Sequence, residues 1–131
     1  MTKIPLKIKK IVDRTVNLIR KEAKGNVKAI LLFGSYAGGT AIWRSDIDIC
    51  VVFKKNISLR EATLFRIHIL GNLPDTVDLQ VFNVLPLKVK KSIVENYKIL
   101  FQSKEFKEEL FIDSNRSLFF ELRRRVASIG A

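Results

Sequence analysis

Three aspartates in this sequence are spaced as ligands for divalent cations. Asp46 and Asp48 stand two residues apart at the start of an apolar run, Ile47–Phe53, and Asp78 lies in a later alternating run. Because residues i and i+2 of a strand point to one face, the first two carboxylates are expected side by side. Adjacent like charges are costly without a cation, and Mg²⁺ prefers carboxylate oxygens. If the strand bearing Asp78 pairs beside them, two-metal phosphoryl transfer is expected.

A glycine-rich turn precedes these aspartates. Gly34-Ser35 follows the apolar run Val27–Phe33, and ten residues separate Ser35 from Asp46. A glycine at a strand end lets the backbone approach a phosphate closely, and the Ser35 hydroxyl with nearby amides can donate to phosphate oxygens. The turn is therefore predicted to hold a triphosphate while the carboxylates hold its metals. A plain helix cap is the competing interpretation of Ser35.

The turn and the aspartates described above resemble the signature of a known family. Phe33-Gly34-Ser35 followed by Ser45-Asp46-Ile47-Asp48 looks like the signature of the DNA polymerase β-like nucleotidyltransferase superfamily. The short chain is similar to its minimal nucleotidyltransferase (MNT) branch. The resemblance covers about residues 27–83 well and the remainder loosely.

The resemblance implies an α/β (α+β) fold with a mixed sheet flanked by helices, ATP as donor and two Mg²⁺ ions. By the same resemblance, Asp46 and Asp48 would ligate the metals, while Asp78 would ligate one metal and help to deprotonate the acceptor hydroxyl. Gly34, Ser35 and Ser45 would bind the nucleotide.

The resemblance also implies a partner. Stand-alone MNT proteins are often antitoxins paired with a HEPN-domain ribonuclease toxin, and members of that group transfer AMP from ATP to a toxin tyrosine. One position departs from the pattern, because many relatives carry an arginine where this chain has Gly38. Arg44, or a lysine from elsewhere, is the candidate to replace that cation.

The other expected elements follow from hydrophobic periodicity and turn residues. A capping box of Ser58 and Glu61 is expected to open the second long helix. The elements are a helix over Lys3–Lys24 ending near Gly25-Asn26, a third strand over Thr76–Asn83, helices over Leu59–Leu70 and Pro86–Tyr97, a short strand over Lys98–Gln102, and one or two helices over Lys104–Ala127. Together they predict a single domain over 1–131, with a catalytic core of about 27–83 and a C-terminal helical part of about 86–131.

The amino-acid composition indicates which ligands and which cellular location to expect. With 24 Lys+Arg against 13 Asp+Glu, the net charge of +11 favours polyanionic ligands, whether nucleotide, nucleic acid or an acidic protein. No apolar run approaches the roughly 18 residues of a membrane span, and no signal peptide is apparent, so a cytoplasmic location is expected. The lone Cys50 is expected to be a buried small hydrophobe.

Several side chains have two interpretations each. His68 is expected to be structural. Tyr36 and Trp43 either stack on a base or cover the core. The basic run Arg123–Arg125 is either a solvated helix face or a docking surface for RNA or an acidic partner. The last segment has more large apolar residues than one helix of a small domain needs, which predicts a protein interface: Leu110, Phe111, Leu118, Phe119, Phe120 and Leu122.

Two other functions remain open at this stage. An RNA end or a small molecule such as an aminoglycoside could replace the protein as acceptor. Alternatively, the chain could be a degenerate transferase that neutralises a toxin by contact alone. The intact aspartates argue against this second alternative, and Gly38 argues mildly for it. The sequence leaves the acceptor and any oligomer undetermined.

Overall fold

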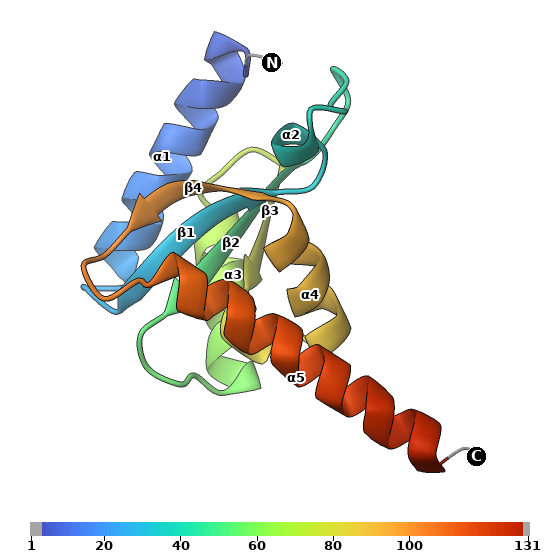
Figure 1. Ribbon diagram of the computed structural model, residues 1–131. Helices are drawn as coiled ribbons and strands as arrows, with labels where there is room; N and C mark the ends of the chain where they lie inside the picture. Colours follow the sequence, from blue (N-terminus) through green and yellow to red (C-terminus); the bar gives the residue numbers. More distant parts are fainter. Residues whose placement is uncertain (1–3, 130–131) are drawn as a thin grey trace.

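A four-stranded sheet with helices on both faces carries the candidate residues (Figure 1). The computed structural model describes residues 4–129. The strands are β1 (Val27–Phe33), β2 (Ile47–Phe53), β3 (Val77–Val81) and β4 (Tyr97–Gln102), in the spatial order β3-β2-β1-β4. β1 is antiparallel to β2 and β4, whereas β2 and β3 are parallel. The predicted mixed sheet flanked by helices is confirmed.

Alternation along the strands divides the core into two layers. Ile49 and Val51 face one layer together with residues of α1 (Leu6–Glu22) and α3 (Leu59–Leu70). Cys50 and Val52 face the other layer, which α4 (Leu87–Glu95) and α5 (Glu108–Ile129) complete. A strand buried on both faces must be apolar at nearly every position, as β2 is. Cys50 is fully buried, as predicted.

Some boundaries differ from the predicted ones. α1 begins at Leu6, directly after Pro5, and the predicted start at Lys3 lies outside the described residues. The third strand ends at Val81 because Phe82–Val84 form a 3₁₀ turn. In that turn the Asn83 side-chain amide donates to the Phe53 carbonyl, and the Asn83 side-chain oxygen accepts from the Phe53 N–H. The Asn83 side chain therefore satisfies the backbone groups at the end of β2 in place of a further residue of β3.

The capping box on α3 is present as predicted. The Glu61 N–H donates to the Ser58 hydroxyl at 3.1 Å, and the Glu61 carboxylate accepts from the Ser58 N–H at 3.3 Å. β4 pairs with β1 at the edge of the sheet, and one continuous helix, α5, follows it and extends past the sheet (Figure 1). No described helix is both long and apolar enough to cross a membrane.

Candidate active site

The turn between β1 and the short helix α2 (Ser35–Gly38) has a conformation that requires glycine. Gly34 has φ 71° and ψ −152°, which L side chains rarely adopt, and a Cβ there would collide with the Asp48 carboxylate. The Gly34 carbonyl accepts from the amides of Ala37 at 3.1 Å and Gly38 at 3.0 Å. The amides of Ser35 and Tyr36 therefore lie at the open start of the turn, where helical N–H groups have no intrahelical partner.

Strand pairing places Asp48 between the turn and Asp78. Asp48 is the register partner of Phe33 on β1 and of Asp78 on β3, so Asp48 and Asp78 point to the same face of the sheet. The sequence did not determine this strand order. Asp46 precedes the first residue of β2 and is exposed, whereas Asp48 is half-buried.

The environment of Asp48 disfavours its ionised form. Burial raises the pKa of the Asp48 carboxyl above its ordinary value, and the negative charges of Asp78 and then Asp46 raise it further. Asp78 and Asp46 thus both repel the ionised Asp48 carboxylate. A divalent cation would relieve this repulsion.

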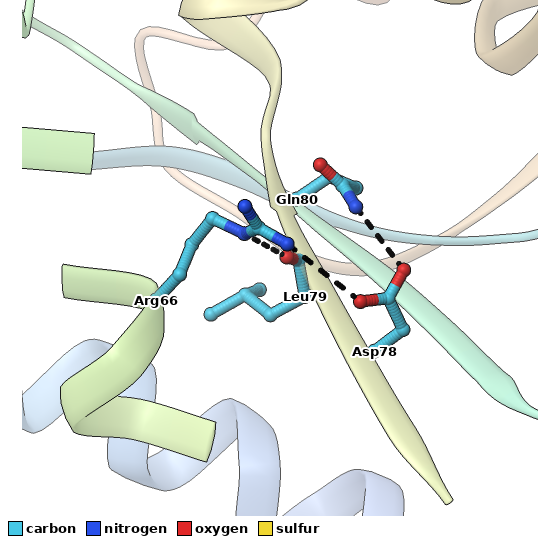
Figure 2. A network of polar contacts seen from close by, with 4 residues as sticks. All are labelled: Arg66, Asp78, Leu79 and Gln80. Atoms are coloured by element: carbon cyan, nitrogen blue, oxygen red, sulfur yellow. Dashed lines mark hydrogen bonds and ion pairs between the residues drawn. The ribbon is translucent and has the colours of Figure 1, made fainter. Parts of the chain in front are cut away.

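Asp78 is held by two neighbours that the sequence analysis did not single out (Figure 2). The Gln80 amide donates to one oxygen of Asp78 at 3.1 Å, and the Arg66 guanidinium lies 3.8 Å from the other. Arg66 also donates through Nε to the Leu79 carbonyl at 2.6 Å. Because β3 is an edge strand, this carbonyl faces outward, and Arg66 reaches around the edge from α3 to both groups. No motif around Arg66 signals this contact, which depends on tertiary packing.

The donor set fits divalent cations in charge and chemistry. Asp46, Asp48 and Asp78 offer hard carboxylate oxygens at one end of a sheet, where the absence of a side chain at Gly34 leaves room for the Asp48 carboxylate. Within residues 4–129, however, no three carboxylate, thiol or imidazole side chains converge into a ready metal cage. One oxygen of Asp78 accepts from the Gln80 amide, and the other faces Arg66.

Ser45 shapes the loop that leads into Asp46. Its hydroxyl accepts from the Ile42 N–H at 2.8 Å, and its own N–H donates to the Ile42 carbonyl at 2.9 Å. Trp43 and Arg44 form the tip of this turn, with the guanidinium 5.1 Å from the indole ring. Trp43 is 86% exposed and does not cover the core, whereas Tyr36 is buried in it.

Gly38 stands against the side chain of Asn96. A Cβ at Gly38 would lie 2.8 Å from the Asn96 amide nitrogen, so a larger residue there requires that side chain to move. Arg44, the candidate replacement for the missing arginine, is exposed at the loop tip.

The other singled-out side chains lie away from this site. His68 is exposed and its Nε2 is 3.2 Å from a Glu22 oxygen, in keeping with a structural contact. Phe111 packs against the core with Phe82 and Phe106. Both sets of exposed residues on α5 remain candidates for a partner surface: the basic run Arg123–Arg125, and the apolar side chains Leu110, Leu118, Phe120 and Leu122.

A family model described as polymerase beta, nucleotidyltransferase, matches residues 7–106, well over half of the chain. The chain belongs to this family. It is therefore a nucleotidyltransferase, and the signature residues from Gly34 to Asp48, with Asp78, all lie within the matched segment.

Both a curated protein and solved structures are similar to this nucleotidyltransferase. A candidate protein adenylyltransferase of Methanocaldococcus jannaschii is 35% identical over 102 residues, which cover 76% of this chain and 75% of that protein. Among solved structures, a chain of a toxin–antitoxin crystal structure with AMP-PNP has a TM-score of 0.71 at 23% identity, covering 89% of this chain and 94% of that one. A chain of the tri-AMPylated Shewanella oneidensis HEPN toxin in complex with MNT antitoxin has a TM-score of 0.68 at 22% identity, covering 89% and 90%. At these identities the structural likeness shows the fold.

Proposed function

We propose that this nucleotidyltransferase moves AMP from ATP to a hydroxyl of a partner protein. The observation that carries the proposal is the register pairing of Asp48 with Asp78 beside the glycine turn at Gly34. This arrangement brings the expected cation ligands and the expected phosphate turn to one end of one sheet. The name of the M. jannaschii relative supports AMP as the group transferred and a protein as its acceptor.

In this proposal the chain contributes chiefly position and charge. Asp46, Asp48 and Asp78 would hold two Mg²⁺ ions, which when bound polarise the attacking oxygen and stabilise the leaving pyrophosphate. The open amides after Gly34 and the Ser35 hydroxyl would donate to phosphate oxygens of ATP. The Ser45 hydroxyl accepts from the Ile42 N–H and so supports the loop before Asp46. Its own O–H would remain available to donate to the nucleotide.

The transfer itself is a single displacement. The acceptor oxygen forms a bond to the α-phosphorus of ATP while the bond to the pyrophosphate oxygen breaks. The acceptor proton leaves toward Asp78, the carboxylate that Arg66 and Gln80 hold in place. Positioning and electrostatics of this kind account for most of the rate enhancement in phosphoryl and nucleotidyl transfer.

The proposed acceptor is a HEPN-domain toxin, with this chain as its antitoxin. Support comes from the fold likeness to chains of toxin–antitoxin complexes, one of which contains an AMPylated HEPN toxin. A reaction that uses ATP in this way would take place in the cytoplasm. The exposed apolar side chains of α5 offer a surface for such a partner.

The test is incubation of the purified protein with ATP, MgCl₂ and a purified HEPN-domain protein, using ATP labelled at the α- or the γ-phosphate. We expect the α-label, and not the γ-label, to appear on the partner, and an Asp46→Asn, Asp48→Asn variant to abolish it. Label on added RNA or on an aminoglycoside instead would replace the protein acceptor. Tight partner binding with no label from any nucleotide would replace catalysis with neutralisation by contact.

A further inference from the structure

The end of the sheet opposite the aspartates has two neighbouring hollows lined by cations. One, of about 440 Å³, is bordered by Lys28, Lys54, Lys90 and Lys107. The other, of about 460 Å³, is bordered by Arg20, Lys21 and again Lys54. Glu105 is the sole acidic residue among the described residues that line either hollow. We call these six cations the distal basic surface.

This surface is separate from the candidate active site. Lys28 lies at the start of β1 and Lys54 directly after β2, whereas Gly34 and Asp48 lie at the opposite ends of the same two strands. β1 has seven residues, which span about 20 Å at roughly 3.3 Å per residue. One ligand cannot be shared between such sites unless it is a long polymer.

Aromatic rings accompany the cations in both hollows. The Arg20 guanidinium lies over the Phe101 ring, 4.1 Å from its centroid, and is exposed on its outer side. In the first hollow, Lys90 Nζ is 5.5 Å from the centroid of Phe82. A guanidinium supported by a ring offers its other face to a nucleobase, and such stacking combined with a positive groove is how sequence-tolerant proteins bind single strands.

Lys54, which borders both hollows, is available to a ligand. Lys54 is paired with Glu105 at 3.0 Å, but both side chains are partly exposed, and an exposed pair contributes so little that a phosphate can displace the glutamate.

We propose that the distal basic surface binds single-stranded nucleic acid, with phosphates on the lysines and a base against Arg20. The Arg20 guanidinium stacked on Phe101 favours a nucleic acid over an acidic protein, because a nucleobase can use the planar face as well as the charge, whereas a carboxylate uses the charge alone. Phe82 is buried and supports Lys90 from the core side.

The first hollow is lined by residues of the layer that holds α4 and α5, and the second by residues of the layer that holds α1. Lys54 borders both hollows, so a strand would pass from one to the other around this end of the sheet. The inference is independent of the acceptor used at the aspartate site.

The test is fluorescence anisotropy with the full chain and labelled oligouridine or oligothymidine of about 12 nucleotides, a length that one small domain can cover. The test variant is Lys28→Gln, Lys54→Gln, Lys107→Gln, which keeps the aliphatic stems. The matched control is Lys7→Gln, Lys9→Gln, Lys10→Gln, which removes the same charge from the half of α1 near the loop of Trp43.

We expect the test variant to lose at least about tenfold in affinity near 50 mM salt. The slope of log affinity against log salt concentration should become shallower by about two, because each of the three lost phosphate contacts on a single strand contributes about 0.7 to that slope. The control should stay within about twofold of the unmodified chain. Nucleotidyl transfer should be unchanged in the test variant, and its circular dichroism should match that of the unmodified chain.

A second variant tests the stacking platform. Arg20→Lys keeps the charge and removes the planar group, so affinity should fall by about fivefold while the salt dependence stays the same. Binding of either strand supports the proposal, and the ratio between them shows whether the 2′-hydroxyl is read. The proposal is overturned by absence of binding, by an equal loss in the α1 control, or by polyglutamate binding as tightly as the oligonucleotides.

Discussion

The two ends of the sheet differ in charge and in how they are built. At one end, Gly34, Asp46 and Asp48 come from one short stretch of sequence, and Asp78 joins them through strand pairing. At the other end, the cations of the distal basic surface come from α1, β1, α4 and the segments after β2 and β4. The aspartate end also has a feature that opposes folding, namely a half-buried Asp48 carboxylate whose ionised form is disfavoured by burial and by Asp78 and Asp46. Perturbed carboxylates of this kind cluster at functional sites.

The largest expected effect separates the two ends by activity. Asp48→Asn keeps the shape of the side chain but removes a cation ligand, so the rate of AMP transfer should fall by about 10³-fold, which corresponds to about 4 kcal/mol. The distal variant Lys28→Gln, Lys54→Gln, Lys107→Gln should stay within about twofold. Single-turnover assays with α-labelled ATP measure both rates. Similar losses in the two variants would remove the distinction between the ends.

A pair of glycines separates backbone strain from the collision at the site. Gly34→Ala meets both a positive φ and the Asp48 carboxylate, whereas Gly25→Ala meets a positive φ of 84° with nothing within 4 Å of the new Cβ. Gly25→Ala should lower the free energy of unfolding by about 1 kcal/mol and leave activity intact. Gly34→Ala should lower it further and reduce AMP transfer by about 100-fold, because Asp48 must move. Thermal unfolding and AMP-transfer assays measure the two effects. Equal losses of stability and of activity in the two variants would show that the collision with Asp48 is unimportant.

Arg66 tests whether holding Asp78 matters. Arg66→Met keeps much of the side-chain length but loses the contacts to Asp78 and to the Leu79 carbonyl. As a positioning residue, Arg66 should affect kcat by about tenfold with little change in the KM for ATP. Arg60→Met, on the exposed side of the same helix, is the matched control and should leave both constants unchanged. An equal rise in KM for both variants would indicate a general effect of charge.

The smallest expected effect concerns stability and pH. The pKa of Asp48 is raised in the folded chain, so ionisation of this carboxyl lowers the free energy of unfolding. The loss of stability is absent at pH values below the pKa of the unfolded chain and complete above the pKa of the folded chain. Without divalent cations, Asp48→Asn should therefore raise the Tm at about pH 7 and have little effect near pH 3, below the ordinary range of aspartate. Adding MgCl₂ should raise the Tm of the unmodified chain at the higher pH. A variant that melts lower at both pH values would contradict this interpretation.

The sequence located the elements that meet at the aspartate end, whereas it gave no indication of the distal basic surface. Gly34 and Asp48 were recognisable because their spacing along the chain is itself the signal. A continuous apolar run located β2, and period-two alternation located most of β3. Asp78 could be named as a ligand, but its pairing with Asp48 required the strand order. Arg66 could not be found, because a side chain that reaches around a sheet edge has no local pattern.

The length of β3 shows a similar limit. The alternation predicted a strand to Asn83, but the Asn83 side chain satisfies the backbone of Phe53 and the chain turns after Val81. A side chain that replaces a strand pairing is a tertiary event that alternation alone does not report. The distal basic surface is the extreme case, since its residues belong to several elements.

The most direct test of the central claim is isothermal titration with α,β-methylene-ATP, whose bridge between the α- and β-phosphorus cannot be cleaved to release pyrophosphate. If the carboxylates hold the nucleotide through divalent cations, binding should require MgCl₂, should be lost in Asp48→Asn, and should be retained in Lys28→Gln, Lys54→Gln, Lys107→Gln. Binding that is independent of MgCl₂ and of Asp48, but lost with the three lysines, would place the nucleotide at the wrong end of the sheet and contradict the account.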